Sequence, residues 1–304
     1  MIHGAYRFPR QDAVIYGRPA HEAVIELAKR YNASRLFILT TRSLGNVLAA
    51  KLAADLGPLC VGRFDAIASH SPRSDVLAGA AAAREAKADL LIALGGGSVI
   101  DATKLIQLCL WAGFTETQQL SPYRMGRGDD RKDASLIPSG VRMIAIPTTL
   151  SAAEFTPFAG VTDGEKRVKE SFTHPDFAPR AVILDPAVTL ETPQRLWSST
   201  GMKAVDHAVE QLCNLERVPM GDAVAAEGLR LLAKGLAATH EDPADLEARA
   251  NCQHGMWLAI SGAASGRGSP VMAGPPARHR RRPGCCWPSC WRATCCSRTC
   301  WNRR

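Results

Sequence analysis

The sequence predicts an α/β fold built around a parallel sheet, followed by an all-helical region. Across the first 186 residues, short apolar runs alternate with stretches whose apolar residues recur at three- and four-residue spacing. This alternation of strands and helices is typical of a parallel sheet with helices on its faces. After Pro193 the strand-like runs cease and only helical patterns follow. We therefore expect an α/β domain over residues 1–186 and a helical domain over residues 187–266, with a ligand cleft between them.

The expected elements are marked by apolar runs and by the turn residues that end them. Strands are expected over residues 14–16, 35–40, 91–94, 143–146 and 181–184. Amphipathic patterns predict helices over residues 21–31, 74–86 and 99–111, and Ser43 is expected to cap a further helix. In the second region, helices are expected over residues 201–212, 221–240 and 243–260.

A glycine loop is the most informative motif of the chain. The apolar run at residues 91–94 stops at Gly95-Gly96-Gly97-Ser98, and a helical pattern starts at Val99. Glycines let the backbone approach a phosphate and adopt positive φ, and the N–H groups of the following helix then face the anion. The loop matches neither G-x-G-x-x-G nor G-x-x-x-x-G-K-[ST]. A tight turn that binds nothing is the structural alternative, but three consecutive glycines lower stability unless something must approach closely.

The charge distribution gives no reason to expect nucleic-acid or membrane partners for the main body of the chain. The formal net charge is +8, but residues 271–304 hold eight arginines and no acid; removing these eight from the 37 basic residues leaves 29, which equals the 29 acidic residues. No apolar run reaches the ~20 residues of a membrane-spanning helix, and the N-terminus lacks the apolar core of a signal peptide. Residues 1–270 hold four scattered cysteines, which suits a reduced compartment, so a cytoplasmic location is expected.

Residues 267–304 differ in composition from the rest of the chain. From Ala273 onward there is no Leu, Ile, Val or Phe, whereas six cysteines and the arginine-rich run Arg278–Arg282 occur there. We expect this tail to remain unpacked, and we attribute it to a reading-frame shift near Gly266–Pro270. With one choice of codons, shifted frames yield His-Gly and Leu-Pro-His-Val-Leu-Glu. A cysteine zinc site and an arginine-rich nucleic-acid arm are alternatives, but neither explains the loss of large aliphatic residues.

Three motifs together resemble the iron-containing alcohol dehydrogenase family, which includes the maleylacetate reductases. They are Gly95–Lys104, Pro147–Glu154 and Gly201–Glu210, and the resemblance extends over about residues 10–266. It implies a dehydroquinate synthase-like two-domain architecture with NAD or NADP in the cleft, a small-molecule substrate and a homodimer. Because the family continues well beyond the last helical pattern, the chain is expected to be C-terminally incomplete.

The resemblance also implies a set of cofactor-binding residues: Gly95, Gly96, Gly97, Ser98, Asp101, Thr148, Thr149 and Lys169. The glycine loop would hold the pyrophosphate, Asp101 and Lys169 would lie near the nicotinamide ribose, and the two threonines would contact the cofactor. Each has a plainer interpretation. Asp101 favours the first turn of a helix, the threonines suit a turn after proline, and Lys169 suits a solvated surface.

The end of the strand at residues 35–40 is where such folds distinguish NAD from NADP. An acidic side chain there accepts hydrogen bonds from the ribose 2′-OH and repels a 2′-phosphate. Thr40, Thr41 and Arg42 stand at this place, and none of them is acidic. We therefore include Thr40 among the cofactor-binding residues and expect no barrier to NADPH.

The metal site of the family is altered in this chain. The resemblance places an Asp-x-x-x-His pair on one helix face, followed by two later histidines, but Lys203 stands four residues before His207. An ammonium cannot ligate a cation, Asp206 points about 100° around the helix, and His254 suits a structural role better. The Fe or Zn expected for the family is therefore disfavoured, with His207 the only matching ligand. Lys203 or His207 would instead polarise a carbonyl or supply a proton, unless both merely line the cleft.

These residues predict an oxidoreductase that transfers a hydride between NAD(P)H and a small alcohol/carbonyl pair. Metal-independent maleylacetate reduction is the alternative within enzymes, and the missing aspartate favours it. A non-catalytic remnant that at most binds nucleotide is the alternative from another class.

Overall fold

The structure is a computed structural model that describes residues 8–126, 130–214 and 218–262. The expectations for residues 267–304 lie outside these ranges; they are the unpacked tail, the frame shift, the cysteine zinc site and the arginine-rich arm. Within the described residues, none of the helices is both long enough and apolar enough to cross a membrane.

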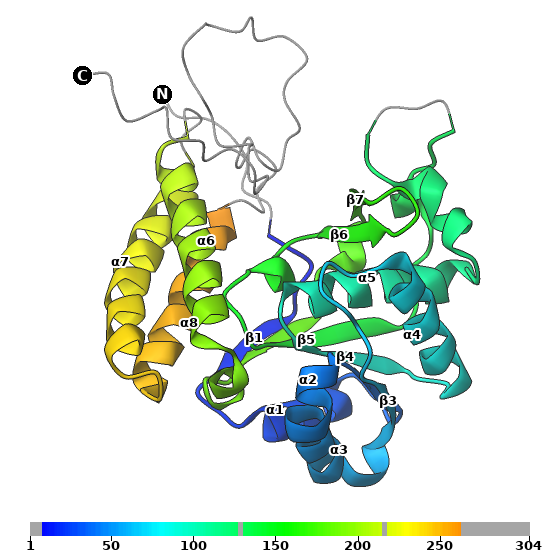
Figure 1. Cartoon of the computed structure of the whole chain (residues 1–304), viewed down its shortest axis with the longest axis horizontal. Helices are drawn as coiled ribbons and strands as arrows, with labels where there is room; N and C mark the ends of the chain where they lie inside the picture. The colour runs from blue at the N-terminus through cyan, green and yellow to red at the C-terminus, as the bar shows by residue number, and fades with distance from the viewer. Residues whose placement is uncertain (1–7, 127–129, 215–217, 263–304) are drawn as a thin grey trace, which may run out of the picture. The chain divides into compact units, whose positions relative to one another are not determined.

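Six parallel strands form the central sheet (Figure 1). Across the sheet they follow the order β1 (Ala13–Tyr16), β8 (Ala181–Leu184), β5 (Arg142–Pro147), β4 (Leu90–Gly95), β2 (Leu36–Leu39) and β3 (Cys60–Phe64). In the central register, Leu90 of β4 lies opposite Leu36 of β2 and Arg142 of β5. The predicted parallel sheet is confirmed, and β3 is an additional strand that no sequence pattern predicts.

Helices cover both faces of this sheet because the strand side chains alternate between two cores (Figure 1). Ile92 and Ile144 belong to the core shared with α1 (Ala20–Arg30) and α3 (Ala50–Leu56). Leu91 and Met143, one residue away on the same strands, belong to the core shared with α4 (Arg73–Glu85) and α5 (Gly97–Ala112). Strands buried on both sides form continuous apolar runs, which is why the sequence predicts them.

Three long helices follow the sheet in the chain: α6 (Gln194–Leu212), α7 (Pro219–Glu241) and α8 (Leu246–Ser261). They pack on one another and on β8, where Val182 and Leu184 share a core with Trp197 and Met256. The predicted helical region is confirmed, although α6 begins at Gln194, directly after Pro193. The domain boundary between residues 186 and 187 stays a prediction.

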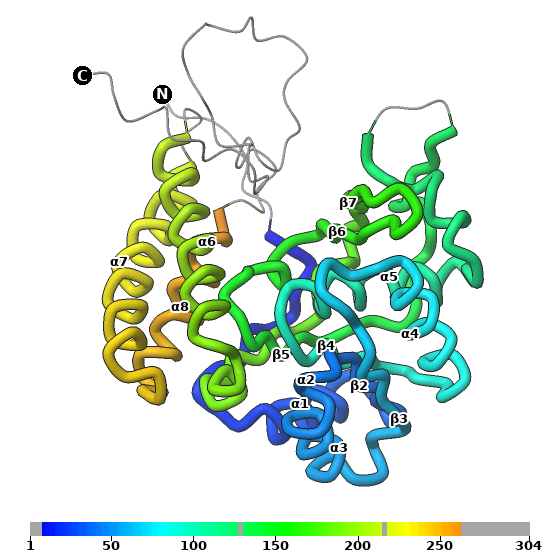
Figure 2. Tube along the Cα trace, in the orientation of Figure 1, coloured from blue at the N-terminus to red at the C-terminus, as the bar shows by residue number. Residues whose placement is uncertain are grey.

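Two further features differ from the sequence-based expectations. An antiparallel hairpin of β6 (Phe158–Asp163) and β7 (Val168–Thr173) lies beside α5 (Figure 2). Because β7 is largely exposed and mixes polar with apolar residues, no apolar run predicts it. The prediction that Ser43 caps a helix is wrong: Ser43 lies inside the short α2 (Arg42–Leu44). Its hydroxyl is 2.9 Å from that of Thr41, the N-cap residue, whose side chain makes no capping bond.

Short helical turns connect the main elements. They are a π-helical stretch, η1 (Gly45–Ala49), and the 3₁₀ turns η2 (Gly57–Leu59), η3 (Thr117–Tyr123), η4 (Ala134–Leu136), η5 (Ala153–Phe155), η6 (Pro175–Phe177) and η7 (Ala187–Glu191). Of these, η5 joins the loop after β5 to the hairpin and therefore borders the candidate site.

Candidate cofactor-binding and catalytic site

The strand order of the sheet reverses between β2 and β4. From β2 the chain continues to the neighbouring β3, whereas β4 is followed on its other side by β5 and then β8. In doubly wound sheets a ligand crevice forms at such a switch point, outside the carboxyl ends of the strands. Thr40 follows β2, and the glycine loop runs from the last residue of β4 into the first turn of α5, so both border this point. The buried Thr40 hydroxyl donates to the Leu94 carbonyl (2.7 Å). Thr40 therefore lies beside the site, but the proton of its hydroxyl is already used within the protein.

The glycine loop is short and tightly packed. Gly95 has a φ of 155°, and Gly96 is the N-cap of α5, which receives no capping hydrogen bond from a side chain. A Cβ at Gly96 would lie 2.9 Å from the methyl carbon of Thr149, and one at Gly97 would lie 2.9 Å from the hydroxyl oxygen of Ser151. Thr149 and Ser151, in the loop after β5, therefore leave no room for a side chain at Gly96 or Gly97, whether or not a ligand is bound.

Two hydroxyl groups beside the glycine loop lack partners. Thr149 Oγ1 and Ser151 Oγ are buried and make no hydrogen bond with any described residue. Buried polar atoms are nearly always satisfied, so two unpaired hydroxyls beside a helix N-terminus indicate the place of a polar ligand. The uncapped N-terminus of α5 offers further donors to an anion. This donor set fits the phosphates and ribose hydroxyls of a dinucleotide.

Ser98 and Thr148 make hydrogen bonds within the protein as well. Ser98 Oγ accepts from the His70 N–H (3.0 Å), which leaves the hydroxyl proton of Ser98 available to a ligand. The Thr148 N–H donates to the Gly95 carbonyl (3.1 Å), so the end of β5 is fixed against the glycine loop. The structure thus brings the predicted pyrophosphate loop and the predicted threonine pair together.

Asp101 and Lys169 also lie close together, around Gly160. The Gly160 N–H donates to Asp101 Oδ2 (3.1 Å), and the Lys169 side chain crosses Gly160 where any Cβ would clash with it. Burial raises the pKa of the Asp101 carboxyl, whereas the charges of Lys104 and Lys169 act to lower it. The pair implied by the resemblance is therefore assembled here, although Lys169 itself is exposed.

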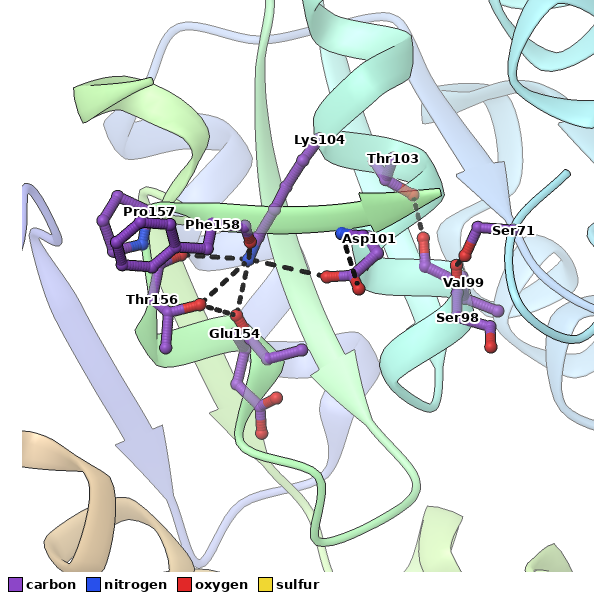
Figure 3. A network of polar contacts seen from close by, with 12 residues as sticks. Ser71, Ser98, Val99, Asp101, Thr103, Lys104, Glu154, Thr156, Pro157 and Phe158 are labelled. Carbon is purple, nitrogen blue, oxygen red and sulfur yellow. Dashed lines mark hydrogen bonds and ion pairs between the residues drawn. The ribbon is translucent and has the colours of Figure 1, made fainter. Parts of the chain in front are cut away.

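Two buried charged residues of the site, Lys104 and Glu154, have no role that the sequence predicts. Lys104 is fully buried, and its ammonium donates to the carbonyls of Ala153, Thr156 and Phe158 (Figure 3). Glu154 is also fully buried, and its carboxyl oxygens make no hydrogen bond with another described residue. Burial lowers the pKa of Lys104 to about 8 and raises that of Glu154 to about 7. A lysine within an otherwise apolar helix is the sequence signal that marks Lys104.

The catalytic candidates Lys203 and His207 lie on α6. This helix is attached to the loop after β5, because the Leu150 N–H donates to Thr200 Oγ1 (3.1 Å). Lys203 forms an ion pair with Asp206 (2.5 Å). Burial, followed by the charge of Lys203, lowers the pKa of His207 to about 4. The imidazole is therefore uncharged at neutral pH.

The donor groups on α6 do not fit a metal ion of the family kind. Within residues 8–126, 130–214 and 218–262, no three or more His, Cys, Asp or Glu side chains are grouped to hold one. Lys203 places a cation where the ligand aspartate is expected, and Asp206 is already paired with it. His254 contacts the Tyr16 ring edge-on, with centroids 4.9 Å apart, and its structural role stays a prediction.

A doubly wound parallel sheet with a glycine loop at its switch point is an arrangement typical of nucleotide-binding α/β proteins. More specifically, the family model "Iron-containing alcohol dehydrogenase" matches residues 11–186, and the model "Fe-containing alcohol dehydrogenase family, C-terminal" matches residues 198–269. The chain belongs to the iron-containing alcohol dehydrogenase family, as the three sequence motifs predict.

The similar proteins include two maleylacetate reductases and a sulfoacetaldehyde reductase. Maleylacetate reductase 2 of Cupriavidus pinatubonensis is 33% identical over 247 residues, which are 81% of this chain and 60% of that protein. The crystal structure of maleylacetate reductase from Agrobacterium tumefaciens matches with a TM-score of 0.72 at 28% identity, over 87% of this chain and 66% of that one. Sulfoacetaldehyde reductase from Bifidobacterium kashiwanohense, solved with NAD+, shares the fold (TM-score 0.75, 20% identity, 86% of this chain, 67% of that one). The chain thus spans about three fifths of the length of the first of these relatives.

Proposed function

We propose that this chain binds NAD(P)(H) at the glycine loop and serves an oxidoreductase that transfers a hydride between the cofactor and a small alcohol/carbonyl pair. The observation that carries the proposal is the pair of unpaired hydroxyls of Thr149 and Ser151 beside the uncapped N-terminus of α5. Membership of the iron-containing alcohol dehydrogenase family supports it, as does the position of these groups at the switch point of the sheet.

The cofactor would be held along the carboxyl edge of the sheet. Its pyrophosphate is assigned to the glycine loop, Gly95–Ser98, because backbone N–H groups and the dipole of α5 favour an anion there. Thr148 and Thr149 would contact it from the end of β5. Asp101 would accept from a ribose hydroxyl, and Lys169 would donate to one, since the two side chains meet around Gly160.

The adenosine end would lie beyond β2, where Thr40 stands. No acidic side chain follows β2 directly, so nothing there repels a 2′-phosphate, and Arg42 is exposed nearby. We therefore propose that both NADH and NADPH bind.

His207 and Lys203 are the proposed groups for the substrate carbonyl. The low pKa of His207 means that the neutral ring would donate an N–H hydrogen bond to the carbonyl oxygen, while the Lys203 ammonium would favour the developing negative charge. The bound cofactor supplies the hydride. Because the donor groups on α6 do not fit a metal ion, no step is assigned to one.

Maleylacetate reduction is the second candidate activity. It is favoured by Lys203 at the position of the metal-binding aspartate and by the 33% identity to a maleylacetate reductase. A cytoplasmic location and a homodimer remain predictions from the sequence. Because the chain spans only part of its relatives, nucleotide binding without turnover is a third outcome that the experiment must distinguish.

Isothermal titration of the full chain with NADH and NADPH tests the proposal. Gly96→Val should abolish binding, since its branched side chain would occupy the phosphate site. Because this side chain would also meet Thr149 in the ligand-free protein, thermal unfolding is measured alongside, and the result counts for a variant that remains folded. Gly164→Val is the matched control and should bind normally, because nothing lies within 4 Å of a Cβ built there. Equal affinities of wild type and Gly96→Val would refute the site. Oxidation of NADH with maleylacetate or with small aldehydes then separates the two activities from binding alone.

A further inference from the structure

Lys104 is a buried lysine whose ammonium is fully occupied by backbone carbonyls. It is 0% exposed, and its Nζ lies 2.6 Å from the Ala153 oxygen, 2.9 Å from the Thr156 oxygen and 2.6 Å from the Phe158 oxygen (Figure 3). An ammonium has three protons to donate, so these three carbonyls use its capacity. Few lysines are buried in this way, because desolvating the charge is costly unless it is matched by strong polar contacts.

These carbonyls belong to one short segment, residues 153–158, which comprises η5 and the start of β6. Carbonyl dipoles that point to one place repel one another unless a cation lies between them. Lys104 therefore determines the path of this segment from a helix that is about fifty residues away in sequence. An apolar side chain could fill the same volume, but it would leave all three carbonyls unpaired.

The same segment leads directly into the residues that meet Asp101 and Lys169. Two residues after Phe158, the Gly160 N–H donates to Asp101 Oδ2 (3.1 Å), and the other oxygen, Oδ1, lies 3.9 Å from Lys104 Nζ. Lys169 pairs with Thr162 in the hairpin register, and its side chain returns across Gly160. One ammonium thus controls the start of β6, one partner of Asp101 and, through Gly160, the place of Lys169.

The far end of the hairpin is held independently of Lys104. Arg73 is buried and pairs with Glu170 and with Asp163, the latter at 3.7 Å. It also donates to the Thr117 carbonyl (3.1 Å) and to Ser121 Oγ (3.0 Å). Loss of Lys104 should therefore shift the base of the hairpin without detaching the hairpin from α4.

From this geometry we propose that Lys104 is a positioning residue for cofactor binding, which places Asp101 and Lys169 for the nicotinamide half of the dinucleotide and leaves the pyrophosphate loop unaffected. The inference rests on the proposed function, because it presumes that a dinucleotide occupies the switch point. The inference assigns two separate roles. The glycine loop binds the phosphates, whereas Lys104, through the hairpin, determines the affinity for the nicotinamide ribose.

The test compares ADP with NADH, because ADP carries the two phosphates but lacks the nicotinamide riboside. Lys104→Met should weaken NADH binding by about tenfold or more, the loss expected when Asp101 or Lys169 no longer makes its charged hydrogen bond to the ribose, and should leave ADP binding unchanged. Lys104→Arg, which keeps the charge and donors, should recover part of the NADH affinity. The full chain is used, with isothermal titration for both nucleotides and thermal unfolding for stability.

Arg84→Met is the matched control for simple loss of a carbonyl-capping cation. Arg84 donates to the Cys109 and Phe114 carbonyls (both 3.2 Å), at the other end of α5, and its loss should lower stability without changing the ratio of NADH to ADP affinity. Equal weakening of ADP and NADH in Lys104→Met, or no weakening of either, would overturn the positioning role. Should Lys104→Met fail to fold, Lys104→Arg decides, with a selective NADH loss supporting the role and an unchanged ratio opposing it. If wild type binds neither nucleotide, the proposed function itself fails.

Discussion

The methyl carbon of Thr149 lies where a side chain at position 96 would be, 2.9 Å from the Cβ site of Gly96. The hydroxyl of the same threonine is buried and has no partner among the described residues. One side chain thus explains why glycine is needed in the loop and also carries one of the two hydroxyls that we propose to bind the cofactor. The two effects are separable by experiment, because the first depends on the methyl group and the second on the hydroxyl.

Thr149→Val keeps the methyl group and removes the unpaired hydroxyl. A buried hydroxyl without a partner costs stability, so the free energy of unfolding of the ligand-free protein should stay equal or rise by about 1 kcal/mol. NADH binding should weaken by about three- to tenfold, because one donor to the ligand is lost. Chemical denaturation and isothermal titration measure the two quantities.

Thr192→Val is the control for this change. Its buried hydroxyl is paired, donating to the Thr148 carbonyl (2.7 Å), so the same substitution there should lower stability. A destabilised Thr149→Val protein with unchanged NADH affinity would mean that this hydroxyl has a protein partner and no ligand.

Little or no Fe²⁺ or Zn²⁺ should bind at His207. Lys203 repels a divalent cation and cannot ligate it, and the described residues offer no cluster of three donors. Elemental analysis should be done on protein whose tail cysteines are replaced by serine. Lys203→Asp restores the i, i+4 pair of carboxylate and imidazole and should increase metal retention above wild type. One equivalent of metal in wild type that disappears in His207→Ala would contradict the expectation.

The His207 ring should remain neutral until the pH falls to about 4. Burial disfavours the imidazolium, and the neighbouring Lys203 charge disfavours it further. Lys203→Ala should therefore raise the pKa of His207 toward its usual value of 6.5, and NMR of the ring protons measures this directly. A His207 that titrates near 6.5 in wild type would remove the argument for a neutral hydrogen-bond donor and reopen its role as a general acid.

The sequence predicts the sheet and most helices because burial on both faces leaves plain apolar runs, as at Leu91–Leu94. It does not predict β7, whose exposed Val168 and Lys169 form no run. The glycine loop and the threonine pair are recognisable as motifs, and their contact through Gly96 and Thr149 agrees with that. The role of Lys104 is not predictable, because it depends on a meeting with carbonyls about fifty residues away that only the folded chain creates.

Glu154 should make the stability of the protein depend on pH. Its pKa is raised from 4.5 to about 7, first by burial; its own backbone N–H and then the charge of Lys104 act against the shift, and the charge of Asp101 adds to it. A carboxyl whose pKa is raised on folding binds its proton more tightly in the folded chain. The stability that this tighter proton binding adds to the folded chain is therefore fully present below pH 4.5 and is lost as the pH rises through 7. One pKa unit corresponds to about 1.4 kcal/mol, so the loss from this group reaches about 3 kcal/mol.

Glu154→Gln removes this titration and should flatten the corresponding part of the stability profile. We expect the difference in unfolding free energy between wild type and Glu154→Gln to change in favour of the variant as the pH rises from 5 to about 8, as measured by denaturant titration at each pH. Glu227→Gln is the control, because Glu227 is exposed and its pKa is lowered by Arg230, so the wild-type slope over this range should persist. If the difference in unfolding free energy between wild type and Glu154→Gln does not change with pH, the pKa of Glu154 is not raised on folding. The carboxyl would then be paired or solvated in the folded protein.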